Sequence, residues 1–235
     1  MIKKWHWFVG FFLLLFGAYF LYFFTQDDFA QSNLPVINNN IQPFSFTDQN
    51  GKSITEREVD GKVYVTEYFF TTCKGICPRM NANMRRVYDA FHSDSNFLII
   101  SHTCMPETDS VPLLKKYEQK MLNGKLDKTN DGTYYINYDS AAMSIPVAVN
   151  DRWHFVTGDK NALYKMARQS YMIDNNKPDT VSIADQFIHT QFFALVDKQS
   201  RVRGIYDGLK EDEIQKLMKD TKELLKEKYR NRSLQ

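Results

Sequence analysis

The chain contains little cysteine and has no strong charge of either sign. Three cysteines occur in 235 residues, and the formal net charge is +2. A nearly neutral balance without a basic, aromatic-interleaved stripe gives no reason to expect nucleic acid as a partner. Only Cys73 and Cys77 lie near each other in the sequence, which argues against a four-thiolate zinc or iron–sulfur site. Apolar residues make up 43% of the chain, which indicates a globular domain with a real core.

Charged residues are also missing from Trp7 to Phe24, near the N-terminus. A helix of about 18 residues rises roughly 27 Å, close to the thickness of a bilayer's hydrocarbon core. Two lysines precede this segment and two aspartates follow it. The positive-inside rule then leaves residues 1–6 in the cytoplasm and sends the rest of the chain outward. We expect residues 7–24 to form a single transmembrane anchor.

The same segment lacks the features of a cleaved leader. It is longer than a signal peptide's apolar region and no small-residue cleavage site follows it. No cysteine follows the apolar run, which argues against a lipoprotein. We therefore expect an uncleaved anchor in a bacterial inner membrane and a domain on the periplasmic, oxidising side. Three cysteines there leave at least one thiol unpaired, so a purely structural disulfide framework is unconvincing.

The remaining chain divides into a tether and one domain. Residues 25–40 are polar and rich in asparagine, as expected for a tether, and residues 41–230 are expected to form the domain. The domain begins with alternating apolar residues around Asn50-Gly51, which predict a β-hairpin. Residues 62–70 are mostly β-branched and aromatic and predict a buried central strand.

The order of elements after that strand predicts an α/β sheet. Helical spacing follows the cysteine motif, residues 96–103 predict a second buried strand, and a helix follows with Ser110 as its cap and Pro112 in its first turn. Residues 123–147 break this rhythm and are interpreted as an insertion with its own hairpin. Strand, helix, a strand pair and a final amphipathic helix complete the chain. A cysteine motif between a strand and a helix is typical of a thioredoxin-like fold.

The spacing of Cys73 and Cys77, in "TTCKGICPRM", allows two kinds of chemistry. Residues at i and i+4 share one face of a helix, about 5–6 Å apart between Cβ atoms. Two thiolates so placed can bind one soft metal ion, or the pair can close into a redox-active disulfide. We expect the helix N-terminus, together with Lys74 and Arg79, to favour the thiolate form. The motif alone does not choose between metal binding and electron transfer.

A third ligand would favour metal binding, and His189 is the candidate. It precedes an apolar run in "DQFIHTQFF", at the start of a predicted strand. In a thioredoxin-like sheet the corresponding loop approaches the cysteine motif. The alternative is a histidine that is satisfied by a hydrogen bond near the sheet edge.

Three blocks of the sequence resemble the Sco (SenC) family of membrane-anchored copper proteins. They are "YFFTTCKGICPRMNANMRRVY", "WHFVTGD" and "ADQFIHTQFFALVDKQSRVRGIYDG". The resemblance covers roughly residues 41–228. It implies a thioredoxin-like fold in which Cys73, Cys77 and His189 are copper ligands, for Cu(I) with Cu(II) as a further oxidation state. Asp185 is a candidate to fix the histidine tautomer from the second coordination shell.

The resemblance also implies a function. The family delivers copper to the binuclear copper site of cytochrome c oxidase and can reduce that site's cysteines. The expected partners are the oxidase subunit that carries this site and a thioredoxin-like reductant, and the protein is expected to be a metallochaperone rather than an enzyme. Two alternatives remain: a thiol–disulfide oxidoreductase and a redox or copper sensor.

Several other residues could suggest chemistry but favour packing. Met80 and Met84 fit a core stripe better than thioether ligands. Cys104 is expected to be a small apolar residue near a strand end, although a third thiol could also resolve a disulfide. His154 favours packing over ligation, and a functional role for Asp109 is doubtful.

Overall fold

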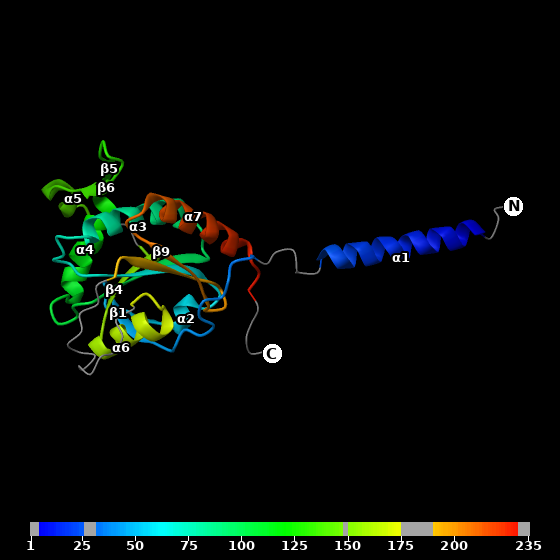
Figure 1. The fold of residues 1–235 in the computed structure, drawn as a ribbon, viewed down its shortest axis with the longest axis horizontal. Helices are drawn as coiled ribbons and strands as arrows, with labels where there is room; N and C mark the ends of the chain where they lie inside the picture. The colour runs from blue at the N-terminus through cyan, green and yellow to red at the C-terminus, as the bar shows by residue number, and fades with distance from the viewer. Residues whose placement is uncertain (1–4, 26–31, 148–149, 175–189, 230–235) are drawn as a thin grey trace.

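A long N-terminal helix precedes an α/β domain in the computed structural model, which describes residues 5–25, 32–147, 150–174 and 190–229 (Figure 1). The helix, α1 (Trp5–Thr25), exposes every side chain from Trp5 to Tyr22. By length and composition it could cross a membrane. Its apolar residues surround the helix on all sides, as expected of a segment that faces lipid rather than a protein core.

A mixed sheet forms the centre of the domain, as predicted. Its strand order is β2-β1-β7-β4-β3-β8-β9, and β3, β4 and β7 run parallel to one another. The remaining strands pair in antiparallel fashion at the two sides. The strand bounds are β1 (Ser45–Asp48), β2 (Ser53–Thr55), β3 (Val63–Phe69), β4 (Phe97–Thr103), β7 (Trp153–Thr157), β8 (Phe192–Val196) and β9 (Val202–Asp207).

The two central strands are buried at every position, which explains their apolar sequences. The predicted N-terminal hairpin is confirmed as β1 and β2. Gly51 has a φ of 76° in the turn between them, a conformation that glycine adopts without steric cost.

Helices cover both faces of the sheet (Figure 1). One face packs against α3 (Cys77–Phe91), α4 (Val111–Asn123) and α7 (Glu211–Lys226). The other packs against α2 (Glu56–Val59), α6 (Lys160–Lys165) and the π-helical turn η2 (Met166–Ser170). The apolar stripe of α7 is confirmed by the burial of Ile214, Leu217 and Leu224. Ser110 occupies the N-cap of α4, but its side chain makes no capping hydrogen bond.

The segment expected to be an insertion does form its own hairpin. β5 (Lys125–Lys128) pairs with β6 (Tyr134–Asn137) in a separate two-stranded sheet, and the short helix α5 (Ser140–Ser144) follows. Two arginines of α3 hold the hairpin and the end of the helix before it. Arg86 stacks over the Tyr134 ring at 4.0 Å, and Arg85 donates to the carbonyl groups at the end of α4.

Two opposite ends of the central strands bear on the site. We call the first the cysteine edge: β3 and β4 end there, at Phe69 and Thr103, and the cysteine motif follows. The tether edge is the opposite end, where the turn between β8 and β9 lies beside the start of β3. There the Gly61 N–H donates to the Lys198 carbonyl at 3.2 Å.

Candidate functional site

The cysteine pair lies at the junction between a buried strand and a helix. Cys73 lies in the loop after β3, where its N–H donates to the Phe70 carbonyl at 3.2 Å. Cys77 is the first residue of α3, and Pro78 follows in the first turn, where a missing N–H costs nothing. Cys73 is half-buried and Cys77 is buried, and both are free thiols. The Cys73 side chain is therefore partly open to solvent, although it packs against the same core that buries Cys77.

Burial dominates the ionisation of Cys77. It raises the pKa of this thiol far above its usual range, and the hydrogen bond and charge of Cys73 raise it further. A backbone hydrogen bond from Phe70 opposes the shift but does not cancel it. The expectation that the helix N-terminus would favour a thiolate is therefore wrong for Cys77 in the reduced protein. Losing this proton requires a strong partner, such as a soft metal ion or a second sulfur.

A buried carboxylate, Asp109, holds the loop that carries Cys73. It is 1% exposed. The Thr71 hydroxyl donates to Oδ1 at 2.5 Å, the Thr71 N–H donates to Oδ2 at 3.2 Å, and the Thr103 hydroxyl donates to Oδ2 at 2.5 Å. Asp109 thereby ties the ends of β3 and β4 together two residues before Cys73. The sequence interpretation missed this role, although two threonines at adjacent strand ends could have suggested a shared acceptor.

A second carboxyl group lies inside the sheet below the motif. Glu67, in β3, is fully buried, and its Oε1 accepts a hydrogen bond from the Ser101 hydroxyl at 2.8 Å. The Trp153 indole N–H donates to the same hydroxyl at 2.9 Å. Oε2 has no partner among the described residues. Burial raises the pKa of Glu67 to about 8, and its charge raises the pKa of Cys77. The sequence did indicate this group, because Glu67 lies within a strand that was predicted to be buried, but the interpretation overlooked it.

The third cysteine packs rather than reacts. Cys104 follows β4, is 3% exposed, and donates from Sγ to the Phe69 carbonyl at 3.2 Å. Burial, reinforced by the charge of Asp109, raises its pKa to about 12. A buried, protonated thiol is a poor nucleophile, which agrees with the packing interpretation.

The remaining candidates also follow the packing interpretation. Met80 and Met84 are buried in the core beneath α3. His102 is buried and stacked on Tyr68, and burial lowers its pKa to about 3. His154 lies with Nδ1 3.3 Å from the Asp48 carboxylate. Within residues 5–25, 32–147, 150–174 and 190–229, no group of three or more His, Cys, Asp and Glu residues could hold a metal.

The predicted third ligand, His189, and its candidate neighbour Asp185 lie outside the described residues. Thr190 is the next described residue, and it is buried, with its hydroxyl donating to the Ile173 carbonyl at 2.7 Å.

Comparison with known proteins identifies the family. The SCO1/SenC family model matches residues 36–129 and 142–226, so the unmatched residues 130–141 comprise the turn after β5, all of β6 and the start of α5. The SCO1 protein homolog of Bacillus subtilis is 27% identical over 188 residues, which are 79% of this chain and 83% of that protein.

Solved structures give the same answer. BsSco, described as a member of the Sco family of cytochrome c oxidase assembly proteins with a disulfide switch, has a TM-score of 0.60 and 26% identity. That match covers 83% of this chain and 98% of the other. Copper-bound ScoI of Bradyrhizobium japonicum has the same fold, with a TM-score of 0.53, 20% identity, and coverage of 78% and 98%. The fold is thus thioredoxin-like, as expected, and the chain belongs to the SCO1/SenC family.

Proposed function

We propose that this protein is a membrane-tethered copper chaperone. It binds copper through Cys73, Cys77 and His189 and delivers it to the binuclear copper site of a respiratory cytochrome c oxidase. The observation that carries the proposal is the reduced thiol pair at the cysteine edge of a SCO1/SenC domain. Copper-bound relatives with the same fold support the choice of metal.

The chain next to His189 supports its role as the third ligand. The Gly208 N–H donates to the Gln191 carbonyl at 2.7 Å, and the Asn83 side chain of α3 donates to the Gly208 carbonyl at 2.8 Å. These bonds connect the segment two residues after His189 to the helix that Cys77 begins. The described residues that follow His189 therefore lie on the same side of the domain as α3, which supports the proposal that His189 completes the site.

Two sulfurs and one imidazole suit Cu(I), which prefers soft ligands and tolerates low coordination. The half-buried Cys73 is the ligand that a recipient can reach first, while the buried Cys77 keeps its place in the core. Copper binding must release the proton of Cys77, whose pKa burial raises. The apparent affinity for copper therefore falls as pH falls, because protons and copper compete for the same sulfur.

The location and the partners follow from the anchor and the family. We propose that α1 spans a bacterial inner membrane once, with the N-terminus in the cytoplasm and the domain in the periplasm. The recipient is the oxidase subunit that carries the binuclear site. A thioredoxin-like reductant keeps the pair reduced in this oxidising compartment.

A second candidate function is thiol–disulfide exchange with the recipient's cysteines. The disulfide switch described for BsSco favours it, because that protein matches this chain over 83% of its length. The same two sulfurs would serve both functions, but exchange does not require His189. Histidine dependence therefore separates the two functions.

Copper titration of the soluble domain, without residues 1–30, tests the lead proposal. The parent should bind one Cu(I) against a competing chromophoric chelator. Cys73→Ser and Cys77→Ser should each weaken binding by orders of magnitude. Cys104→Ser is the matched control, because this thiol is buried away from solvent, and it should bind like the parent. Equal binding by all four proteins would overturn the proposal.

A further inference from the structure

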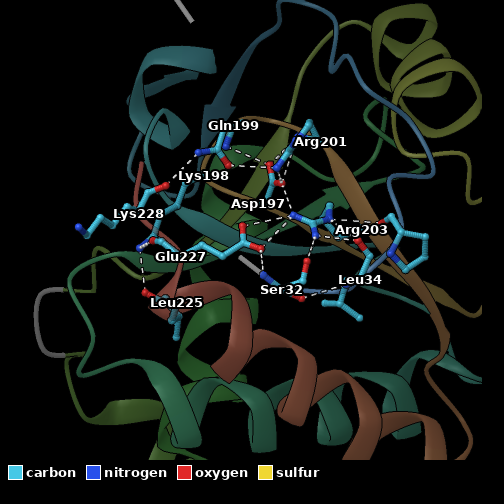
Figure 2. A network of polar contacts seen from close by, with 11 residues as sticks. Ser32, Leu34, Asp197, Lys198, Gln199, Arg201, Arg203, Leu225, Glu227 and Lys228 are labelled. Carbon is cyan, nitrogen blue, oxygen red and sulfur yellow. Dashed lines mark hydrogen bonds and ion pairs between the residues drawn. The ribbon is translucent and has the colours of Figure 1, made fainter. Parts of the chain in front are cut away.

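A buried arginine at the tether edge binds the segment that leads in from α1 (Figure 2). Arg203, in β9, is 4% exposed. Its Nη1 contacts the carboxylates of Asp197 at 2.8 Å and Glu227 at 3.3 Å. Its Nη2 donates to the backbone carbonyl groups of Leu34 at 2.7 Å and Ser32 at 3.3 Å. We call these five residues the Arg203 clamp.

The segment after the clamp is also attached to the domain. Ile37 donates its N–H to the Val202 carbonyl at 2.8 Å, and Val202 donates back to the Asn38 carbonyl at 2.9 Å. The Asn38 side chain donates to the Ser170 carbonyl at 2.7 Å, and the Ser32 N–H donates to the Glu227 carboxylate at 2.8 Å. Much of the stretch expected to be a tether is therefore bound to the domain.

This attachment shortens the reach of the domain. Between the end of α1 at Thr25 and the clamp at Ser32 the chain can span at most about 25 Å. If the chain were free up to β1 at Ser45, the limit would be about 70 Å. The clamp therefore shortens the maximum distance between the end of α1 and the domain from about 70 Å to about 25 Å.

The clamp and the cysteine motif lie at opposite ends of one strand. β3 begins beside the β8–β9 turn, with Tyr64 opposite Val196, and it ends at Phe69 before the motif. Five residue steps along a strand correspond to about 16 Å. The cysteine motif therefore lies farther than the Arg203 clamp from the point where the chain from α1 meets the domain.

We propose that the Arg203 clamp holds the domain close to the bilayer by its tether edge and presents the cysteine edge to the aqueous side. The partner that fits this surface is a protein whose copper-binding side chains stand above the membrane surface in the aqueous phase. An acceptor site at the level of the lipid headgroups does not fit. The orientation rests on the proposed membrane anchor alone, whereas the copper-binding partner rests also on the proposed function.

Fluorescence quenching of the full chain in lipid nanodiscs tests the inference. In a background without the native cysteines, a single label is placed at Lys74→Cys, beside the motif, or at Arg57→Cys, in α2 near the tether edge; both side chains are exposed. Nitroxide-headgroup lipids should quench the label at position 57 several-fold more than the label at position 74. Equal quenching in the otherwise unaltered chain, or failure to insert into nanodiscs, would overturn the inference.

Two variants and a matched control give the clamp its own test. Arg203→Met should reduce the difference between the labels, whereas Arg201→Met should keep it. Arg201 also pairs with Asp197, but its contacts are with Asp197 and Gln199 in its own turn. If Arg203→Met does not fold, about ten Gly and Ser residues inserted before Ser32 lengthen the flexible chain and should have the same effect. An unchanged difference in the lengthened chain would also overturn the inference.

Hydrogen exchange separates this inference from the proposed function. In the unaltered chain, the amides of Ser32 and Ile37 should exchange on the order of tenfold more slowly than in Arg203→Met. Copper stoichiometry of the same samples is measured in parallel. Loss of copper binding with intact protection would contradict only the proposed function, and fast exchange with intact copper binding would contradict only the clamp.

Discussion

The two ends of β3 are built for different purposes. At the tether edge the Arg203 guanidinium is surrounded by carboxylates and carbonyl groups, and the nearby Lys198 ammonium donates to the carbonyl groups of Leu225 and Glu227 (Figure 2). At the cysteine edge the half-buried Cys73 lies on a loop that the Asp109 carboxylate holds, and Glu67 Oε2 has no partner within the part of the chain that the structure describes. Saturated polar contacts favour one fixed arrangement, whereas incomplete ones leave groups available for a ligand or a proton.

Breaking the tether edge should give the largest loss of stability without loss of copper binding. Arg203→Ala leaves Asp197 and Glu227 buried without their shared cation, which should cost about 3–5 kcal/mol in the free energy of unfolding. The more exposed Arg201→Ala is the matched control and should cost no more than about 1 kcal/mol. Urea unfolding of the soluble domain measures both. A clear loss of copper affinity in folded Arg203→Ala would show that the two edges are not independent.

The buried carboxyl group of the cysteine edge should make stability depend on pH. Burial raises the pKa of Glu67 to about 8 in the folded state, so the folded protein keeps a proton that the unfolded chain loses. The contribution of Glu67 to stability is then fully present below its unfolded pKa, near 4.5, and is lost as pH rises towards 8. Glu67→Gln should remove this loss, so that stability relative to the parent increases between pH 5 and pH 8 by on the order of 3 kcal/mol. Parallel stability–pH curves would contradict the assignment.

Loss of Asp109, which holds the Cys73 loop at the cysteine edge, should lower stability less than loss of Arg203 and should also weaken copper binding. Asp109→Ala removes the acceptor of Thr71 and Thr103 and should cost about 1–3 kcal/mol. Because Thr71 lies two residues before Cys73, the variant should also bind Cu(I) more weakly than the parent. Thr108→Ala removes an exposed hydroxyl that donates to the Met105 carbonyl and is the matched control. Equal copper affinities of both variants and the parent would remove Asp109 from the site.

Local patterns in the sequence predicted the fold better than they predicted the polar contacts. The hairpin at Asn50-Gly51, the buried strand before Cys73 and the stripe of α7 follow from turn chemistry and periodicity, so they could be read directly. The contacts of Arg203 with Ser32 and Leu34 join residues about 170 positions apart, and no local pattern encodes them. In the sequence, the charged residues of the Arg203 clamp resemble ordinary solvated residues, because only the folded sheet brings them together.

The candidate site, like the fold, could be predicted from the sequence only in part. The spacing of Cys73 and Cys77 indicated a thiol pair, but it could not indicate which sulfur would be buried. That difference arises because Cys77 begins a helix that packs on the sheet, and burial there outweighs the effect of the helix terminus on the pKa. Asp109 was discounted because its block, "CMPETD", departs from the family pattern, and its contact with Thr71, 38 residues away, has no local signal in the sequence.

The proposed copper delivery by this protein depends most directly on His189 as the third ligand. The decisive measurement compares Cu(I) affinity and dithiol–disulfide exchange rate in the soluble domain, for the parent and for His189→Ala. If His189 is a ligand, His189→Ala should lose copper affinity by at least about tenfold, as expected when a first-row metal loses one of three ligands, and its exchange rate should stay close to the parent's. Unchanged copper affinity together with fast exchange would contradict the proposed copper site and establish thiol–disulfide exchange as the function of the pair.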